Sequence, residues 1–572
     1  MDEGTSASAQ LKATDSVLEH HQDLPKAVDS GLPSQATNTV EHYKDWPNSA
    51  GFNASEDHKT PIELAVSGNI PSYASGILYR TGPGGYKVPF ANKNGEIATS
   101  HWFDGFTTTH KFELVSSDDS MKVTYSSYCQ VDQLIESIRK TGRRDEPAFG
   151  QKRDPCDSLF RKIKTLFHQS LDYNSAHGAN IGVAIRDTLP QEHKKDGRSV
   201  MTLTTDTALV KQFDMDTLEP IGVTSQKVLH PSLSGPLSAA HAAHDPETGD
   251  IFNYNLAFGR HITYRVFRAS PSTGEVEILA TIGGGSVKGA YLHSMLLTEN
   301  FVVLCIWPAY YRAGGVSILW TRNLVDAMQP FDAKQETTWI VIDRRHGRGV
   351  VKKFTSPALF CFHTVNAWEE RAADGSVDLI CELIEYPNMD FLHWFYYENL
   401  VSTEFVDKID AQAKRANTSS SLTRYKLSNV PLTGTTKEKA TAEEVLRISA
   451  SGAGDLPRIN PHYALKQHRY VWTVADTNKS SFVDTLSKID TVTKECTLWH
   501  EPKQTPGEAI FIPRPGATEE DDGVVLTVVL DGERGTSYLL CLDAHTMKEL
   551  GRVDVAHPVG FGFHGAFLPE KA

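Results

Sequence analysis

Several features that would narrow the function of this chain are scarce or missing. The seven cysteines are odd in number, widely spaced and never arranged as C-x-x-C. This argues against a disulfide framework and a zinc–thiolate motif, and predicts reduced thiols in a cytosolic setting. Positive charge is in deficit, since 57 Lys and Arg stand against 71 Asp and Glu. Because phosphate binding depends on clustered Lys and Arg, nucleic acid is not expected as the main partner.

Long apolar runs are also missing. The longest uncharged apolar run, residues 301–311, is too short to cross a bilayer. The N-terminus opens MDEGTSASAQ, which lacks the charged and apolar regions of a secretory signal. We therefore expect a cytoplasmic protein that is soluble or peripheral to a membrane.

The organisation of the chain is that of one large domain behind a tail. Residues 1–40 are rich in Ser, Ala, Asp, Glu and His without hydrophobic periodicity, which predicts a disordered N-terminal tail. The hydrophobic fraction of 40% and the charged fraction of 22% are those of an ordinary globular protein. We expect residues 41–572 to form a single domain.

The sequence pattern of that domain predicts an all-β fold. Short runs rich in β-branched and aromatic residues, such as GILYRTGPGGYKV and MKVTYSSYCQV, alternate with Gly, Pro, Asn and Asp at hairpin spacing. Many short strands indicate a sandwich, a barrel or a propeller, and the length favours the propeller. No exact repeat is visible, so any blades have diverged.

Two stretches interrupt the β pattern. Residues 131–175 are predicted to be helical, and CDSLFRKIKTLFHQSL places apolar residues at three- and four-residue steps with basic residues between them. This segment is either a cap helix packed on the β core or a basic amphipathic helix on a membrane surface, with Leu159, Phe160 and Phe167 as the candidate membrane contacts. Residues 408–446 are rich in Lys, Thr, Ser, Ala and Glu and are predicted to be a polar surface insertion.

Four histidines lie in or beside apolar or glycine-rich strand-like runs. They are His241 in AHAAHDPETGD, His293 in YLHSMLL, His363 in FCFHTVNAWEE and His564 in GFGFHGAF. A single buried histidine is usually a hydrogen-bonded core residue, and that interpretation remains open for each of them. Because they are far apart in the chain, they can meet only on the axis of a closed, radially repeated structure.

Four such histidines would suit a metal ion. Neutral imidazole binds Zn, Cu, Fe and Ni, and carboxylates behind the ligands would accept the second ring N–H and fix each tautomer. Asp206, Asp455 and Glu508 occur in suitable surroundings. An octahedral iron held by four histidines would keep two positions open for O2 and substrate.

The order of motifs resembles the carotenoid cleavage oxygenase family from about Gly76 to the C-terminus. The matching stretches are YRTGPGG, HWFDG, AHxxxDPxTG, YLHSMLLTENFVVL, FHTVNAWEE, EEDDGVVLTVVLD and GFGFHGAF. The resemblance implies a seven-bladed β-propeller with a helical cap over one face. It also implies one Fe(2+) per chain on the propeller axis, with O2 as co-substrate and glutamates behind three of the four histidines.

Carried onto this sequence, the resemblance assigns the iron ligands to His241, His293, His363 and His564. His244 competes for the first position, but the family places its ligand four residues before the Asp-Pro pair. Glu508 matches a family glutamate, whereas Asp206 and Asp455 stand where Glu is expected. An aspartate is one methylene shorter, so a direct bond to the histidine and a bridging water are both open there. The remaining motif histidines are expected to be structural: His101, His110 and His557.

The implied reaction is oxidative cleavage of a conjugated C=C bond of a carotenoid, giving an apocarotenal and a second carbonyl product. Within the family, HKFEL and VTYSS are closest to animal and fungal members, which favours a torulene-like substrate. The alternatives are a stilbene-cleaving oxygenase acting on resveratrol-type phenols, retinoid isomerisation at the same site, and a non-catalytic carotenoid-binding propeller. Because carotenoids reside in lipid, we expect peripheral contact with a membrane. The bond that is cleaved, the tunnel residues and the oligomeric state do not follow from the sequence.

Overall fold

The protein is described here as a computed structural model covering residues 46–117, 120–153, 175–186, 194–195, 197–285, 287–372, 375–401, 419–450 and 452–570. All of them belong to one compact unit, His42–Ala572. The predicted tail, residues 1–40, lies outside the described residues.

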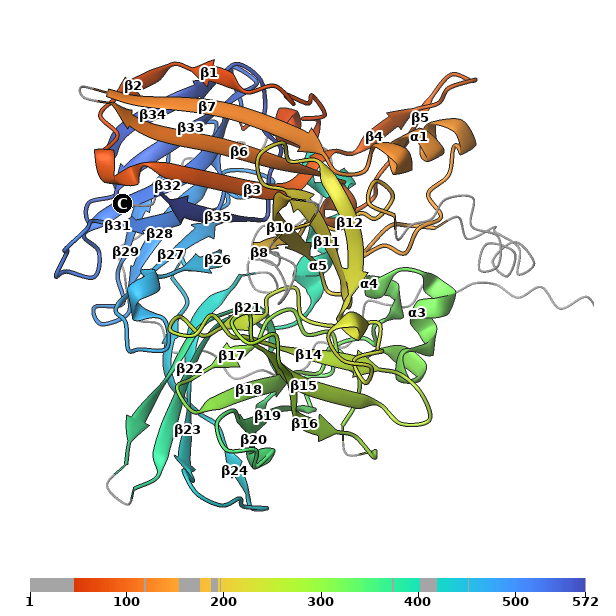
Figure 1. Cartoon of the computed structure of the whole chain (residues 1–572), viewed down its shortest axis with the longest axis vertical. Helices are drawn as coiled ribbons and strands as arrows, with labels where there is room; N and C mark the ends of the chain where they lie inside the picture. The colour runs from red at the N-terminus through yellow and green to blue at the C-terminus, as the bar shows by residue number, and fades with distance from the viewer. Residues whose placement is uncertain are drawn as a thin grey trace, which may run out of the picture. The chain divides into compact units, whose positions relative to one another are not determined.

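The described residues form the predicted seven-bladed β-propeller (Figure 1). Blade 1 has the strand order β35 (His564–Pro569), β3 (Gly76–Gly85), β6 (Phe106–Ser117), β7 (Ser120–Cys129), β1 (Ile62–Leu64). Blade 2 has the order β8 (Ala184–Arg186), β10 (Arg198–Thr204), β11 (Leu209–Asp214), β12 (Pro220–Ser225), with β9 (Lys194–Lys195) paired to β10. Blade 3 has the order β13 (Ala243–His244), β14 (Ile251–Ala257), β15 (Thr263–Ala269), β16 (Val276–Ile282).

The remaining blades follow the same plan. Blade 4 has the order β17 (Leu296–Leu297), β18 (Phe301–Ile306), β19 (Glu336–Asp343), β20 (Val350–Pro357), β24 (Lys439–Thr441). Blade 5 has the order β21 (Phe360–Arg371), β22 (Val377–Tyr386), β23 (Ser421–Val430), β25 (Glu443–Ile448). Blade 6 has the order β26 (Asp455–Arg458), β27 (Tyr470–Ala475), β28 (Thr485–Asp490), β29 (Cys496–Trp499). Blade 7 joins β30 (Gln504–Pro506), β31 (Ile510–Pro513), β32 (Gly523–Asp531), β33 (Thr536–Asp543), β34 (Glu549–Val555), β2 (Val66–Gly68).

Strands from the two ends of the described chain close the ring. The last strand, β35, pairs antiparallel with β3, from Gly76 opposite Pro569 to Thr81 opposite His564. Red β3 and dark blue β35 therefore lie side by side in Figure 1. The early strand β2 completes blade 7 by pairing with β34. Blades 1 and 7 each pair a strand from near the start of the chain with one from near its end. The ring is therefore closed by strands that lie far apart in the sequence.

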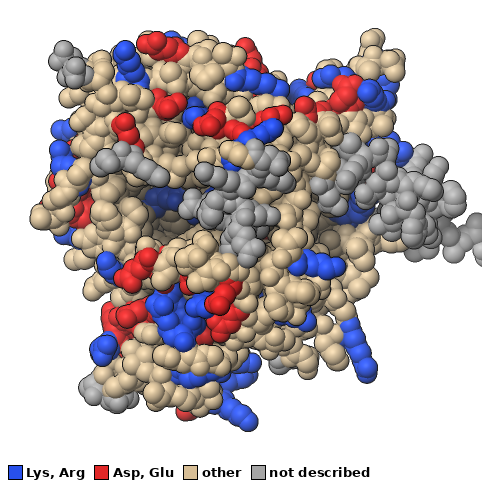
Figure 2. All heavy atoms as spheres, in the orientation of Figure 1, with Lys and Arg blue, Asp and Glu red and all other residues tan. Residues whose placement is uncertain are grey.

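The blades are held by apolar runs buried on both faces. All residues of β18 are buried, and those of β32 are buried as far as Leu530. Their composition, FVVLCI and GVVLTVVLD, is β-branched and aliphatic, as expected for strands covered on both sides by neighbouring blades. On the face drawn in Figure 2, Lys and Arg side chains are interspersed with Asp and Glu.

Helices are a minor part of the described residues. The α-helices are α1 (Asp132–Thr141), α3 (Val316–Thr321), α4 (Leu324–Ala327), α5 (Asp390–Trp394) and α6 (Tyr397–Val401). Short 3-10 helices are η1 (Ser49–Phe52), η2 (Ser72–Ala74), η3 (Trp102–Asp104), η4 (Gln226–Val228), η5 (Arg312–Gly315) and η6 (Pro461–Tyr463). Helix α1 falls in the range predicted to be helical, and it ends at Gly142, whose φ of 66° is the left-handed conformation that glycine favours. The membrane-contact candidates Leu159, Phe160 and Phe167 lie outside the described residues. No helix of the described chain is long and apolar enough to cross a membrane.

The predicted surface insertion at 408–446 is wrong for the part that the structure describes. Strands β23 and β24 lie within it and β25 begins there, and β23 and β25 belong to blade 5. The sequence of β23, SLTRYKLSNV, buries Leu422, Tyr425 and Leu427 and places Arg424, Lys426 and Ser428 in less buried positions. This is the period of two of a blade strand, which the polar flanking residues concealed.

Candidate metal centre

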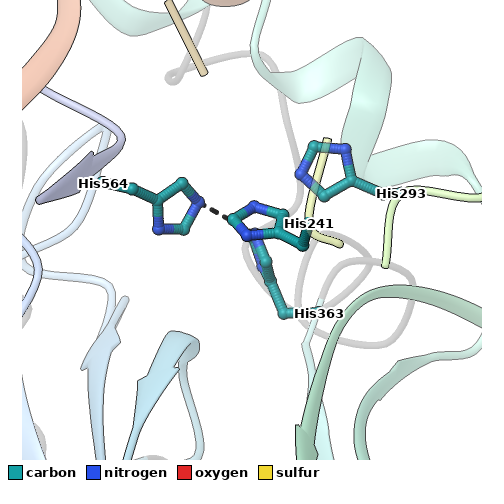
Figure 3. A group of neighbouring side chains, drawn as sticks. All are labelled: His241, His293, His363 and His564. Carbon is teal, nitrogen blue, oxygen red and sulfur yellow. Dashed lines mark hydrogen bonds between the residues drawn. The ribbon is translucent and has the colours of Figure 1, made fainter. Parts of the chain in front are cut away.

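Four histidines from four blades converge at one point. One ring nitrogen of each of His241, His293, His363 and His564 lies within 4.8 Å of those of the others. His564 begins β35 and His363 lies in β21, while the other two precede β13 and β17 closely. These strands are edge strands of their sheets, so the edges meet on the axis. Figure 3 shows the four rings directed toward a common centre.

Three of these histidines donate Nδ1–H to a carboxylate. His293 bonds Asp206 Oδ1, His363 bonds Asp455 Oδ1 and His564 bonds Glu508 Oε1, each at 2.7 Å. The two aspartates therefore reach their histidines directly, without a bridging water. Asp206 follows β10, Asp455 begins β26 and Glu508 lies between β30 and β31. Blades 1, 3, 4 and 5 thus supply the histidines, and blades 2, 6 and 7 supply the carboxylates.

The donor set fits a metal cation. A neutral imidazole that donates from Nδ1 carries its lone pair on Nε2. The Nε2 atoms of His363 and His564 face each other at 3.2 Å (Figure 3), an arrangement of two lone pairs that a cation between them would stabilise. The Nε2 atom of His241 is buried without a hydrogen-bond partner. Four convergent imidazole nitrogens and three supporting carboxylates match a site for a divalent transition metal.

Charge in the site is set by burial and by neighbouring ions. Burial lowers the pKa of His564 to about 3 and that of His241 well below its usual range, so both rings are neutral. Burial alone would raise the pKa of Glu508, but the charge of Arg458, the hydrogen bond from His564 and the charge of Arg80 outweigh it and hold that pKa below its usual range. Glu508 also accepts hydrogen bonds from Arg80 Nη1 at 3.1 Å and from the Gly565 amide at 2.8 Å.

The fourth histidine has different surroundings. His241 Nδ1 lies 3.2 Å from Nη2 of Arg186, a group that can only donate. Its backbone amide donates to the His293 carbonyl oxygen at 3.0 Å, which ties the two segments together. His244, the competitor in the sequence, lies in β13 and is not part of the cluster.

The other motif histidines lie elsewhere. The imidazole of His101 is within hydrogen-bond distance of the Leu392 carbonyl oxygen, at 2.8 Å, and accepts from the Phe103 amide. His110 is paired with the Tyr125 hydroxyl at 2.8 Å. His557 stacks on His58 with 3.9 Å between ring centroids. The surroundings of all three suit the structural role expected of them.

A cavity of about 620 Å³ adjoins the centre and is lined by His293, His363 and His564. Much of its wall is aromatic, including Trp102, Phe103, Phe362, Phe391, Phe395, Phe482 and Phe563. Among its described lining residues, Tyr386 is the only tyrosine and Lys227 the only lysine. Such a wall suits a long apolar molecule that brings no polar group near the histidines.

Two tyrosines of the site did not emerge from the sequence. Tyr291 donates its hydroxyl to Asp206 at 2.8 Å, and Tyr386 donates to Asp455 at 2.7 Å. Tyr291 precedes His293 by two residues, so the YLH spacing in a strand-like run was an available signal. Tyr386 carried none, because it reaches the site only through the pairing of β22 with β21, where it lies opposite Phe360.

Known proteins resemble this chain in sequence and in fold. Residues 51–569 match the family model described as retinal pigment epithelial membrane protein. The chain is 42% identical to a carotenoid dioxygenase of Neurospora crassa over 92% of each chain, and 43% identical to a torulene dioxygenase of Fusarium fujikuroi over 93% of this chain and 95% of the relative. The cobalt-substituted apocarotenoid oxygenase of Synechocystis has the same fold, with a TM-score of 0.68 at 20% identity over 92% of this chain and 99% of that one.

The fold and the site define a β-propeller with a four-histidine centre on its axis. The chain belongs to the retinal pigment epithelial membrane protein family, the family of the carotenoid oxygenases, as its motifs predicted.

Proposed function

We propose that this protein is an iron(II)-dependent dioxygenase that cleaves a conjugated double bond of a torulene-like carotenoid. The observation that carries the proposal is the set of four convergent histidines, three with a direct carboxylate partner, in the wall of an aromatic cavity. His241, His293, His363 and His564 would hold the iron. Bound iron would supply the activation of O2 for cleavage of the double bond.

The chain's own residues orient the histidines and the substrate and keep water out of the cavity. Asp206, Asp455 and Glu508 keep the Nδ1 proton in place, so that each Nε2 remains available to the metal. The aromatic rings of the cavity exclude water and align one double bond of a rigid polyene next to the histidines. We assign no side chain as a general acid or base.

The cavity favours a carotenoid over a stilbene. Stilbene-cleaving members would be expected to hold the phenol with a tyrosine and a lysine. Here the hydroxyl of Tyr386 is already donated to Asp455, and Lys227 is an exposed residue. The named relatives point the same way, since the Fusarium fujikuroi protein is a torulene dioxygenase. A non-catalytic carotenoid carrier would not require the complete set of histidines.

Product analysis tests the proposal. Purified protein loaded with Fe(II) is given O2 and, in separate reactions, torulene, β-carotene or resveratrol, and the products are identified by mass spectrometry. We expect an apocarotenal from torulene, whose mass identifies the cleaved bond. Hydroxybenzaldehydes from resveratrol alone would contradict the carotenoid assignment, and iron-loaded protein without any product would favour the carrier.

We also propose that the protein takes its substrate from a lipid surface. In helix α3, Val316 is 61% exposed, Leu319 66% and Trp320 52%. Leu319 also lines the cavity, together with Ile318, so this apolar surface is continuous with the cavity wall. Arg312 and Arg322 flank the helix. Exposed apolar residues with an interfacial Trp and flanking cations suit shallow insertion into an anionic bilayer.

Charging the α3 surface should release the protein from membranes. Removing a buried leucine from lipid costs roughly 1.5–3 kcal/mol, so we expect Leu319→Glu to weaken binding to vesicles containing anionic phospholipid about tenfold or more. Vesicle flotation measures the effect. The control is Val492→Glu, because Val492 is 70% exposed and lies in a turn outside α3. Equal binding of the Leu319 variant and the wild type would contradict docking through α3.

A further inference from the structure

Each carboxylate behind the histidines receives a second donor on the oxygen that the histidine does not use. Asp206 Oδ2 accepts from the Tyr291 hydroxyl at 2.8 Å, and Asp455 Oδ2 accepts from the Tyr386 hydroxyl at 2.7 Å. On Glu508 the same place is taken by Arg80 and the Gly565 amide. The two aspartates therefore share one arrangement, His–Asp–Tyr, and the glutamate has a different one.

We propose that Tyr291 and Tyr386 are positioning residues of the metal centre, which hold the two aspartates in the orientation that presents His293 and His363 to the ion. The inference rests on the proposed function, because it assumes that the four histidines bind a metal. It assigns these tyrosines the role of fixing the orientation of the two aspartates, which neither the histidines nor the carboxylates fix by themselves.

The physical reason is that the carboxylate group of an aspartate can rotate. The last torsion of an aspartate side chain has a broad energy well, so donors on Oδ1 alone, including the Leu456 amide that bonds Asp455 Oδ1 at 2.8 Å, leave Oδ2 free to swing. A second donor on the opposite oxygen fixes the plane and keeps Oδ1 directed at the Nδ1–H of the histidine. Donation from the hydroxyl also draws electron density from the carboxylate, which leaves the proton on the imidazole and the lone pair on Nε2.

The tyrosines are themselves held rigidly. Tyr291 is 1% exposed, and its backbone carbonyl accepts from Trp307 Nε1 at 2.8 Å. The ring of Tyr386 stacks on Phe391 with 3.9 Å between centroids and 7° between planes. Tyr386 also lines the cavity, so the same ring contacts the space where substrate would lie and supports a ligand of the metal.

The test measures the affinity of the metal-free protein for Co2+. A titration gives the affinity, and the ligand-field absorption of the bound ion reports its surroundings. Loss of a group that hydrogen-bonds a metal ligand commonly weakens metal binding 10- to 100-fold, and the tyrosines act one step further out, so their loss should lie at the low end of that range. We expect Tyr291→Phe and Tyr386→Phe each to weaken Co2+ binding about tenfold and to shift the absorption bands. Because the two act on different aspartates, the double variant should lose about 100-fold.

A matched control lies in blade 5. Tyr425 is buried and donates its hydroxyl to Glu385 at 2.9 Å, but no histidine of the cluster bonds to Glu385. Tyr425→Phe should therefore leave the Co2+ affinity and spectrum unchanged. Wild-type affinity and spectrum in both Tyr291→Phe and Tyr386→Phe would overturn the inference, as would an equal loss in the Tyr425 variant. Failure of the wild type itself to bind Co2+ would instead overturn the proposed metal centre.

Discussion

Replacing His293 with alanine should abolish metal binding at physiological concentrations and reduce carotenoid cleavage about 1,000-fold or more. The variant removes one of the four nitrogen donors. Asp206 also loses the Nδ1–H group from which it accepts a hydrogen bond. A metal centre contributes several kcal/mol to the chemical step, and each 1.4 kcal/mol is about tenfold in rate. Iron content by mass spectrometry and turnover of torulene are measured on the same preparation.

The control for this experiment is His244→Ala. His244 is a histidine of the same AHAAHDP motif as His241, but it stands outside the cluster. We expect it to retain stoichiometric iron. If the His293 variant kept its iron and its activity, the histidines would be structural residues. If His244→Ala lost its iron while a His241→Ala variant kept it, His244 and not His241 would be the first ligand.

Replacing Glu508 with glutamine should destabilise the metal-free protein by about 3–5 kcal/mol, the usual effect of removing one partner of a buried ion pair. Glu508 is fully buried, and its carboxylate bonds Arg458 Nε at 2.8 Å and Arg80 Nη1 at 3.1 Å. Glutamine keeps the size and a hydrogen-bond acceptor but removes the charge. Arg80, itself only 3% exposed, would then be a buried cation without a counterion.

Urea-induced unfolding of the metal-free protein measures this effect. The comparison is Glu549→Gln, which removes a carboxylate from a partly exposed pair with Arg552. Exposed pairs contribute roughly 0–1 kcal/mol, so this variant should unfold close to the wild type. Similar unfolding midpoints for the two variants would show that Glu508 does not compensate the charge of the buried Arg80.

The sequence allowed the ligands to be predicted better than their supports. Each of the four histidines stands in an apolar or glycine-rich stretch that matches a family motif, and the resemblance to the family singled them out as ligands. Whether Asp206 and Asp455 bond their histidines directly could not be predicted, because that depends on the backbone positions at the end of β10 and the start of β26. The structure places both within 2.7 Å of their histidines. Tyr386 was missed because its partner Asp455 lies 69 residues further along the chain.

The fold was predictable in class and less so in detail. Strand-like runs and length indicated a propeller, but diverged blades gave no repeat from which to count them. The error at 408–446 shows why. A blade strand needs apolar residues only at alternate positions, so the polar residues of β23 resembled a loop. The exposed apolar residues of α3 were overlooked because the helix has only 6 residues and does not show an amphipathic repeat.

The most direct test of this account is X-ray absorption spectroscopy at the iron edge on protein purified without oxygen and loaded with Fe(II). We predict one iron per chain, surrounded by nitrogen and oxygen neighbours, with the outer-shell scattering of four imidazole rings. That signal should diminish in the His293→Ala variant. Iron bound with fewer imidazoles, with sulfur neighbours, or equally well in wild type and variant would contradict the four-histidine centre.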